Sequence, residues 1–163
     1  MNKETKHNLY KEAEEEINSL LSNEKDMILK MASINSILKN KLDYYFWVGF
    51  YIVNNGQLVI GPYQGTLGCL YISYERGICG RAARLMETQI VDDVHKDSEH
   101  IACDSKSNSE IVVPVIDSQN KLIAVFDIDS TEFSSFDEID RLYLEKILKK
   151  HFTESEISTT WKW

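Results

Sequence analysis

The chain has 163 residues, of which 43% are hydrophobic and 27% are charged, with only 7 glycines and 2 prolines. This composition is typical of one globular domain and excludes a disordered or fibrous chain. The formal net charge of -8 disfavours a nucleic-acid partner, because proteins that bind a phosphate backbone usually present a basic face.

The sequence also bears on location. It contains no apolar stretch of about 18 residues, and residues 1–16 alternate acidic and basic side chains. We therefore expect no membrane span and no export signal. The chain has 3 cysteines, an odd number that is unusual in a disulfide-stapled secreted domain. A cytoplasmic location, where thiols stay reduced, is the expectation.

Two amphipathic helices are predicted at the start of the chain. Apolar side chains recur at helical spacing in residues 2–22 and again in 24–42, with polar residues between them. The apolar stripe of the second helix is expected to pack in the core. A final helix is predicted near residue 135, because Ser135 and Glu138 form a capping-box pattern before another apolar stripe.

Two pairs of β-prone runs predict two hairpins. In the first pair, an Asn-Gly dipeptide separates residues 44–53 from 57–60, and this dipeptide is a strong hairpin signal. The aromatic part of the first run could wall a pocket, although most of it should be core. The second pair, 110–116 and 122–129, is largely apolar, so we expect its strands to be buried on both faces.

Between the hairpins, residues 61–104 are irregular, with one strand expected near 67–73 and a short helix near 78–86. Strand pairs framed by helices indicate an α+β fold. We expect a central antiparallel sheet with helices packed on one face and ligand-binding loops on the other. Long irregular connections on a rigid scaffold often carry functional sites.

The domain organisation is expected to be simple. Residues 1–152 should form a single domain, with 1–42 as its N-terminal helices, followed by a C-terminal tail, 153–163. The tail is polar until Trp161-Lys162-Trp163, and two exposed tryptophans would be unusual on a free end. We expect these tryptophans to dock on the domain; a contact with a partner is the alternative.

All three cysteines, Cys69, Cys79 and Cys103, lie in the irregular middle of the chain. A cysteine is most often a small buried hydrophobe, but clustering in loops favours chemistry. Their separations do not match the close pairs of a zinc site, so no metal is expected, although His95 and His100 could complete an unusual set. A thiolate nucleophile fits better, because a sulfenic acid on one sulfur condenses with a second thiol.

Three carboxylates form the second group of candidates. Glu110 opens the second hairpin, and Asp127 and Asp129 close it. Residues two apart on a strand share a face, and the hairpin register can bring Glu110 beside the two aspartates. Crowded like charges raise at least one pKa, which leaves a protonated carboxyl able to act as a general acid. The alternative is that these strand-end acids simply face water.

Eight strings at matching separations carry a family resemblance. They are residues 47–51 (WVGFY), 61–65 (GPYQG), Cys69, 77–80 (GICG), 91–95 (VDDVH), 100–104 (HIACD), 109–114 (SEIVVP) and 127–130 (DIDS). Together they resemble the free methionine-(R)-sulfoxide reductases, small enzymes built on a single GAF domain. The resemblance covers residues 44–152, and a generic GAF domain would lack all three cysteines.

The resemblance implies a role for each candidate residue. Cys103 matches the family's nucleophile, Cys69 its resolving thiol, and Cys79 a third cysteine that can also enter disulfide exchange. The positions that match the substrate pocket are Trp47, Glu110, Asp127 and Asp129. The carboxylates would hold the substrate's ammonium group and assist proton delivery to the sulfoxide oxygen.

The implied activity is reduction of free L-methionine (R)-S-oxide through a sulfenic acid on Cys103 and an intramolecular disulfide. Thioredoxin or a similar dithiol would reopen the disulfide, with no cofactor, in a response to oxidative stress; a homodimer is an open alternative to a monomer. Peptide-bound methionine lacks the free ammonium, which would explain its rejection. Because the acids oppose a thiolate, a helix N-terminus or His100 should lower the pKa of Cys103.

Two other functions remain open at this stage. The first is a GAF-type sensor that binds a cyclic nucleotide or another small ligand without chemistry. Such modules usually accompany a catalytic or DNA-binding domain, for which this chain leaves no residues. The second is a redox-sensing thiol switch, which peroxide rather than a sulfoxide would oxidise.

Overall fold

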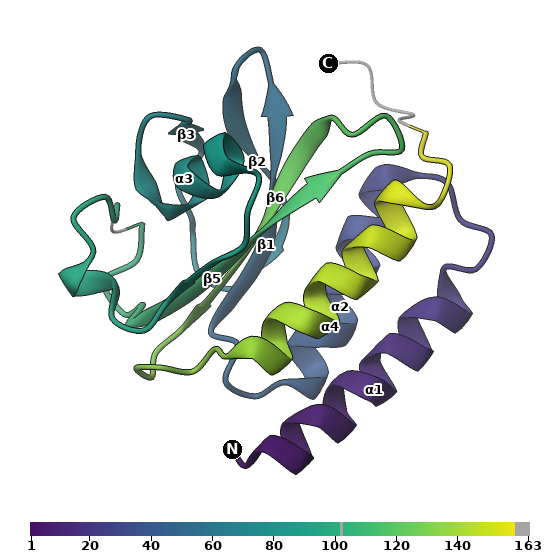
Figure 1. Ribbon diagram of the computed structural model, residues 1–163, viewed down its shortest axis with the longest axis horizontal. Helices are drawn as coiled ribbons and strands as arrows, with labels where there is room; N and C mark the ends of the chain where they lie inside the picture. Colours follow the sequence, from purple (N-terminus) through teal and green to yellow (C-terminus); the bar gives the residue numbers. More distant parts are fainter. Residues whose placement is uncertain (102, 159–163) are drawn as a thin grey trace.

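The computed structural model describes residues 1–101 and 103–158. Its centre is a six-stranded antiparallel sheet with the strand order β3-β2-β1-β6-β5-β4 (Figure 1). The strands are β1 (Trp47–Asn54), β2 (Gln57–Gln64), β3 (Tyr71–Ser73), β4 (Gln89–Val91), β5 (Ser109–Ile116) and β6 (Leu122–Ser130). The two predicted hairpins, β1–β2 and β5–β6, are confirmed, and β1 joins them by pairing with β6.

Helices α2 (Met27–Lys41) and α4 (Glu138–Leu148) cover one face of the sheet, with α1 (Lys3–Leu20) packed outside them (Figure 1). A five-residue π-helical turn, Lys149–Thr153, continues α4. The short helix α3 (Gly77–Leu85) and the long connections lie on the opposite face. The α+β prediction is therefore confirmed, with α3 as the one helix on the loop side.

Strand alternation divides the interior into two cores. On β1, Val48, Phe50 and Ile52 face the three long helices, whereas Trp47 and Tyr51 face α3. This is the period of two that a pleated strand imposes. The first core is mainly apolar, and it anchors the sheet from behind. The second core is smaller, and it leaves room for polar groups on the α3 face.

The predicted capping box is wrong. Helix α4 begins after Asp137, whose carboxylate accepts a hydrogen bond from the Ile139 amide at 2.8 Å, while Asp140 accepts one from the Asp137 amide at 2.7 Å. Ser135 instead donates to the Ser130 hydroxyl at 2.8 Å. Asp140 is fully buried and also accepts from Lys6 Nζ at 2.6 Å, so the cap ties α1 to α4.

The irregular middle is only partly as predicted. The strand expected near 67–73 is limited to β3, and the sequence analysis did not find β4 or the 3-10 turn at Val94–Lys96. Trp161-Lys162-Trp163 lie outside the described residues. Earlier in the tail, Ser158 exchanges backbone hydrogen bonds with Lys25 and Met27, at 2.7 and 2.9 Å. The boundary at residue 152 stays a prediction.

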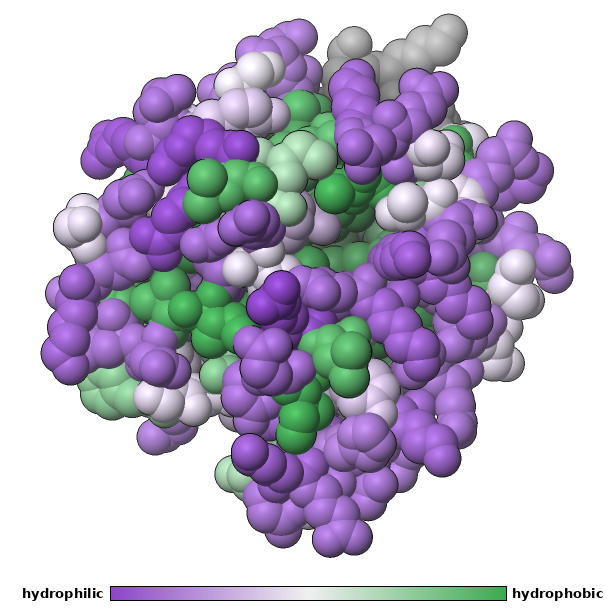
Figure 2. All heavy atoms as spheres, viewed as in Figure 1, coloured by the Kyte–Doolittle hydropathy of each residue, from purple (hydrophilic) through white to green (hydrophobic). Residues whose placement is uncertain are grey.

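The surface seen in the view of Figure 1 is mostly hydrophilic, with hydrophobic residues gathered in small separate patches (Figure 2). Among the described residues, none of the helices combines the length and apolar character that crossing a membrane requires.

Candidate active site

A small cavity opens on the α3 face of the sheet, between α3 and the connections that flank it. Its floor comes from β1, β5 and β6, and its wall comes from α3 and the loop before β5. Six of the seven residues singled out from the sequence line it: Trp47, Cys79, Cys103, Glu110, Asp127 and Asp129. The seventh, Cys69, lies beside the cavity and is joined to Cys103.

Strand register assembles the acidic floor. Asp129 of β6 is paired with Glu110 of β5 on one side and with Trp47 of β1 on the other. Asp127 follows two residues earlier on the same face of β6. Glu110 and Asp127 are each only 6% exposed. The three acids lie together, as expected. The alternative, that these acids simply face water at the ends of their strands, does not describe this arrangement.

Trp47 lies flat along the floor because the chain has a glycine at position 49. A Cβ on Gly49 would stand 2.6 Å from the indole Cη2 and 2.4 Å from the Tyr63 Cβ. The indole is stacked between two tyrosines, with ring centroids 5.8 Å from Tyr51 and 5.4 Å from Tyr63. The predicted aromatic wall is therefore built from alternate residues of β1 and a partner on β2.

Burial shifts the protonation of all three acids. Desolvation raises the pKa of Glu110 and of Asp127 well above its ordinary value, and the neighbouring carboxylates raise both further. Desolvation also raises the pKa of Asp129 to about 7, against a hydrogen bond from Ser107 that lowers it. Crowding was the expected cause, but burial is the larger one. The floor therefore retains protons near neutral pH.

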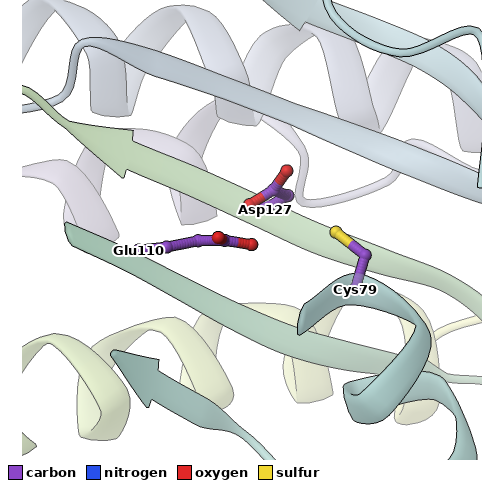
Figure 3. Close-up of side chains that lie close together, drawn as sticks. All are labelled: Cys79, Glu110 and Asp127. Carbon is purple, nitrogen blue, oxygen red and sulfur yellow. The ribbon is translucent and has the colours of Figure 1, made fainter. Parts of the chain in front are cut away.

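Cys79 stands in the first turn of α3 and points into the acidic floor (Figure 3). It is buried and free, and desolvation followed by the charge of Asp127 raises the pKa of its thiol. Cys79, Glu110 and Asp127 each offer one ligand atom, all within 4.8 Å of one another. His95 and His100 are not part of this cluster. These donors could surround a metal ion or an ammonium group.

One atom of the floor lacks a partner. The Oδ1 atom of Asp127 is buried and has no hydrogen-bond partner among residues 1–101 and 103–158. Cys79 and Glu110 lie within hydrogen-bond reach of the Asp127 side chain. A donor from a ligand at Oδ1 would satisfy the buried atom that is left without a partner. A cationic donor would also offset the crowded carboxyl groups.

Cys69 and Cys103 form a disulfide with Cα atoms 5.3 Å apart. It links the connection after β2 to the connection before β5. Beside it, the Thr66 hydroxyl donates to Asp104 at 2.6 Å, and the Trp47 indole N–H donates to the Thr66 carbonyl at 2.9 Å. Cys103 is exposed at the cavity mouth and Cys69 is partly exposed. The site thus places Cys103 at its mouth and acids with raised pKa values on its floor.

The sequence analysis missed the residues that hold the loop before Cys103. Arg81 of α3 binds Asp97 through two hydrogen bonds of 2.7 and 3.1 Å, and Arg84 binds Glu99 at 2.8 Å. The sequence did offer a signal for these contacts. Arg81 and Arg84 are three residues apart on the predicted helix, and the two acids are two residues apart on the loop that follows. These two contacts hold the loop at positions six and four residues before Cys103.

His100 does not supply the positive charge that the sequence analysis sought for the thiolate. Burial lowers the pKa of His100, and the nearby His95 lowers it further. Its imidazole is therefore neutral near pH 7, at which a cation would be needed. The helix N-terminus nearest the cavity, that of α3, carries Cys79 rather than Cys103.

Comparisons with known proteins agree with this geometry. The family model described as "GAF domain" matches residues 39–148. Free methionine-R-sulfoxide reductase of Escherichia coli is 36% identical over 155 residues, covering 95% of this chain and 92% of that protein. The chain belongs to the free methionine-R-sulfoxide reductase family. A reductase of this family from Neisseria meningitidis, solved in complex with its substrate, is 43% identical with a TM-score of 0.84, and 90% of each chain is covered.

This chain is also similar to a protein with a less specific name. "GAF domain-containing protein A" of Dictyostelium discoideum is 43% identical over 150 residues, covering 91% of this chain and 94% of that protein. The chain is thus similar both to named reductases and to a protein named only for its GAF domain. Similarity extends over nearly the whole length of these relatives.

The raised pKa of Asp129 predicts a measurable effect on stability. In the unfolded chain this carboxyl keeps its ordinary pKa of 3.8, whereas in the fold the pKa is about 7. The folded protein therefore holds a proton that the unfolded chain releases, and stability is lost as pH rises from about 4 through 7. Asp129→Asn removes this titration. Urea unfolding of the disulfide form should show a flatter pH dependence and, at about pH 8, a gain on the order of 1 kcal/mol. The same pH slope in both proteins would contradict the burial of this charge.

Proposed function

We propose that this protein reduces free L-methionine (R)-S-oxide to methionine. The observation that carries the proposal is the placement of a reactive cysteine, Cys103, at the mouth of a cavity whose floor holds three acids with raised pKa values. Membership of the reductase family supports the same activity. The cavity would supply a nucleophile and acids able to donate a proton.

The acidic floor would bind the amino-acid end of the substrate. An ammonium group offers three hydrogen-bond donors and a positive charge, which suits Glu110, Asp127 and the unpartnered Oδ1 of Asp127. Trp47 would pack against the aliphatic part of the substrate. A methionine within a peptide lacks this ammonium and would leave the buried carboxyl groups unpaired, which explains selection of the free amino acid.

The chemistry would begin with attack of the Cys103 thiolate on the sulfoxide sulfur. A sulfoxide oxygen leaves poorly unless it is protonated, and a carboxyl group that keeps its proton near pH 7 can supply one. Attack and protonation give an intermediate in which the Cys103 sulfur is bonded to the substrate sulfur, which carries a hydroxyl group. The hydroxyl group is then transferred to the Cys103 sulfur as the S–S bond breaks with its electron pair on the substrate sulfur, so that methionine departs and Cys103 is left as a sulfenic acid. The thiol of Cys69 then attacks this sulfur, releases water and forms the Cys69–Cys103 disulfide that the structure contains. A dithiol of the thioredoxin type would reopen it.

Substitution of the two cysteines should separate attack from recycling. Cys103→Ser should abolish methionine formation, because a serine hydroxyl is a far weaker nucleophile than a thiolate. Cys69→Ser should release about one methionine per site and then stall as a sulfenic acid or as a Cys103–Cys79 disulfide. Single-turnover assays with mass analysis distinguish these outcomes. In the wild type, methionine sulfoxide should remove two titratable thiols; no loss would favour a sensor, and normal turnover of Cys103→Ser would refute the proposal.

The three acids should differ in their kinetic effects. In Glu110→Gln, Asp127→Asn and Asp129→Asn the shape is kept but the proton is lost. The proton donor's variant should lose about 10²-fold or more in kcat, whereas a contact to the ammonium should chiefly raise KM. The wild-type rate should fall as pH rises through the donor's raised pKa, because the acid form is the active one. The donor's variant should lack that fall, and normal kinetics in all three variants would remove the acids from the mechanism.

A further inference from the structure

The surface beside the disulfide is unusually apolar. Ten large hydrophobic side chains are exposed among the described residues, and three of them lie within two positions of Cys69. Leu67, Leu70 and Tyr71 are 71%, 56% and 64% exposed. We call these three residues the Cys69 patch. Scattered hydrophobic residues are ordinary on a protein surface, but a group around a reactive sulfur marks a contact site.

The charge pattern sets this region apart from the rest of the chain. Residues 54–74 contain no Asp, Glu, Lys or Arg, although these types make up 27% of the sequence. The patch lies at the end of the sheet, where β3 is the edge strand. Leu67 also lines the cavity mouth together with Cys103. The segment that carries Cys69 is therefore uncharged, although Asp104 contacts it by accepting a hydrogen bond from Thr66.

The substrate does not explain the patch. A free amino acid binds inside the cavity, against acids and Trp47, and has no need of apolar side chains outside it. A macromolecule is needed to cover Leu70 and Tyr71. A second copy of this chain is disfavoured as the occupant, because a stable contact of that kind would bury the disulfide that must be reopened.

We propose that the Cys69 patch is the docking surface for a protein dithiol that reduces the Cys69–Cys103 disulfide by attacking Cys69. The partner's thiolate forms a bond with Cys69 Sγ, the Cys69–Cys103 bond breaks, and its electron pair leaves on Cys103 as a thiolate. The partner's second thiol then attacks the mixed disulfide, which frees Cys69 and leaves the partner oxidised. This step rests on the proposed function only in that turnover forms the disulfide.

The proposal is tested on the preformed disulfide, with no sulfoxide present. Reduction is timed with thioredoxin and, separately, with dithiothreitol, a small dithiol that needs no docking surface. In Leu70→Ser/Tyr71→Ser, the second-order rate with thioredoxin should fall roughly tenfold, as expected for loss of interface anchors. The rate with dithiothreitol should stay within about twofold of wild type. Leu142→Ser, a change at a 62% exposed residue of α4, is the matched control and should leave both rates unchanged.

Equal slowing with both reductants would overturn the proposal, since the variant would then have altered the disulfide itself; an unchanged thioredoxin rate would also overturn it.

The attacked sulfur is identified with a thioredoxin whose second active-site cysteine is serine, which traps the mixed disulfide. Mass analysis should find the adduct on Cys69, and an adduct on Cys103 would contradict the assignment. Because no sulfoxide is used, failure to reduce methionine sulfoxide would refute the proposed function without affecting this result.

Discussion

The burial of three carboxyl groups on one face of the sheet is the constraint on which the site depends. Desolvation makes their charged forms costly, so Glu110, Asp127 and Asp129 hold protons at a pH where exposed acids are ionised. The same burial leaves an atom of Asp127 without a partner. One physical cause therefore supports both functions proposed for the floor: an acid that keeps its proton can protonate the sulfoxide oxygen, and a neighbouring acid that ionises when the substrate binds can pair with the ammonium group.

Such a floor is unfavourable for folding, and the other face of the sheet provides the compensation. There Val48, Phe50 and Ile52 of β1 and Ala124, Phe126 and Ile128 of β6 pack in the helix-side core and are almost fully buried. Apolar burial of this kind is the main stabilising contribution in a domain of this size. The register that assembles the acids is fixed by this core, because a slip of one residue would turn the apolar side chains of β6 toward the cavity.

The sequence was informative wherever local periodicity decides the structure. The two hairpins, the three long helices and the grouping of Asp127 with Asp129 follow from spacing alone. The clustering of the three cysteines singled them out, and resemblance to a family gave them and Trp47 their expected roles. What spacing could not show depends on three-dimensional packing. Asp137 replaces Ser135 as the helix cap because Asp140 is drawn inward by Lys6, and short β4 forms only because β5 lies beside it. The Arg81–Asp97 contact joins two segments that no periodic pattern in the sequence predicts to lie close together.

The central claim is that buried acids select a free amino acid while Cys103 attacks its sulfoxide. The most direct test compares reduction of the separated (R) and (S) epimers of free methionine sulfoxide with reduction of the N-acetylated (R) epimer, which lacks the ammonium charge. We predict that kcat/KM for the free (R) epimer exceeds that for the N-acetylated form by at least about 10²-fold, because acetylation leaves buried polar groups unpaired. Equal values for the free and acetylated substrates would contradict the account.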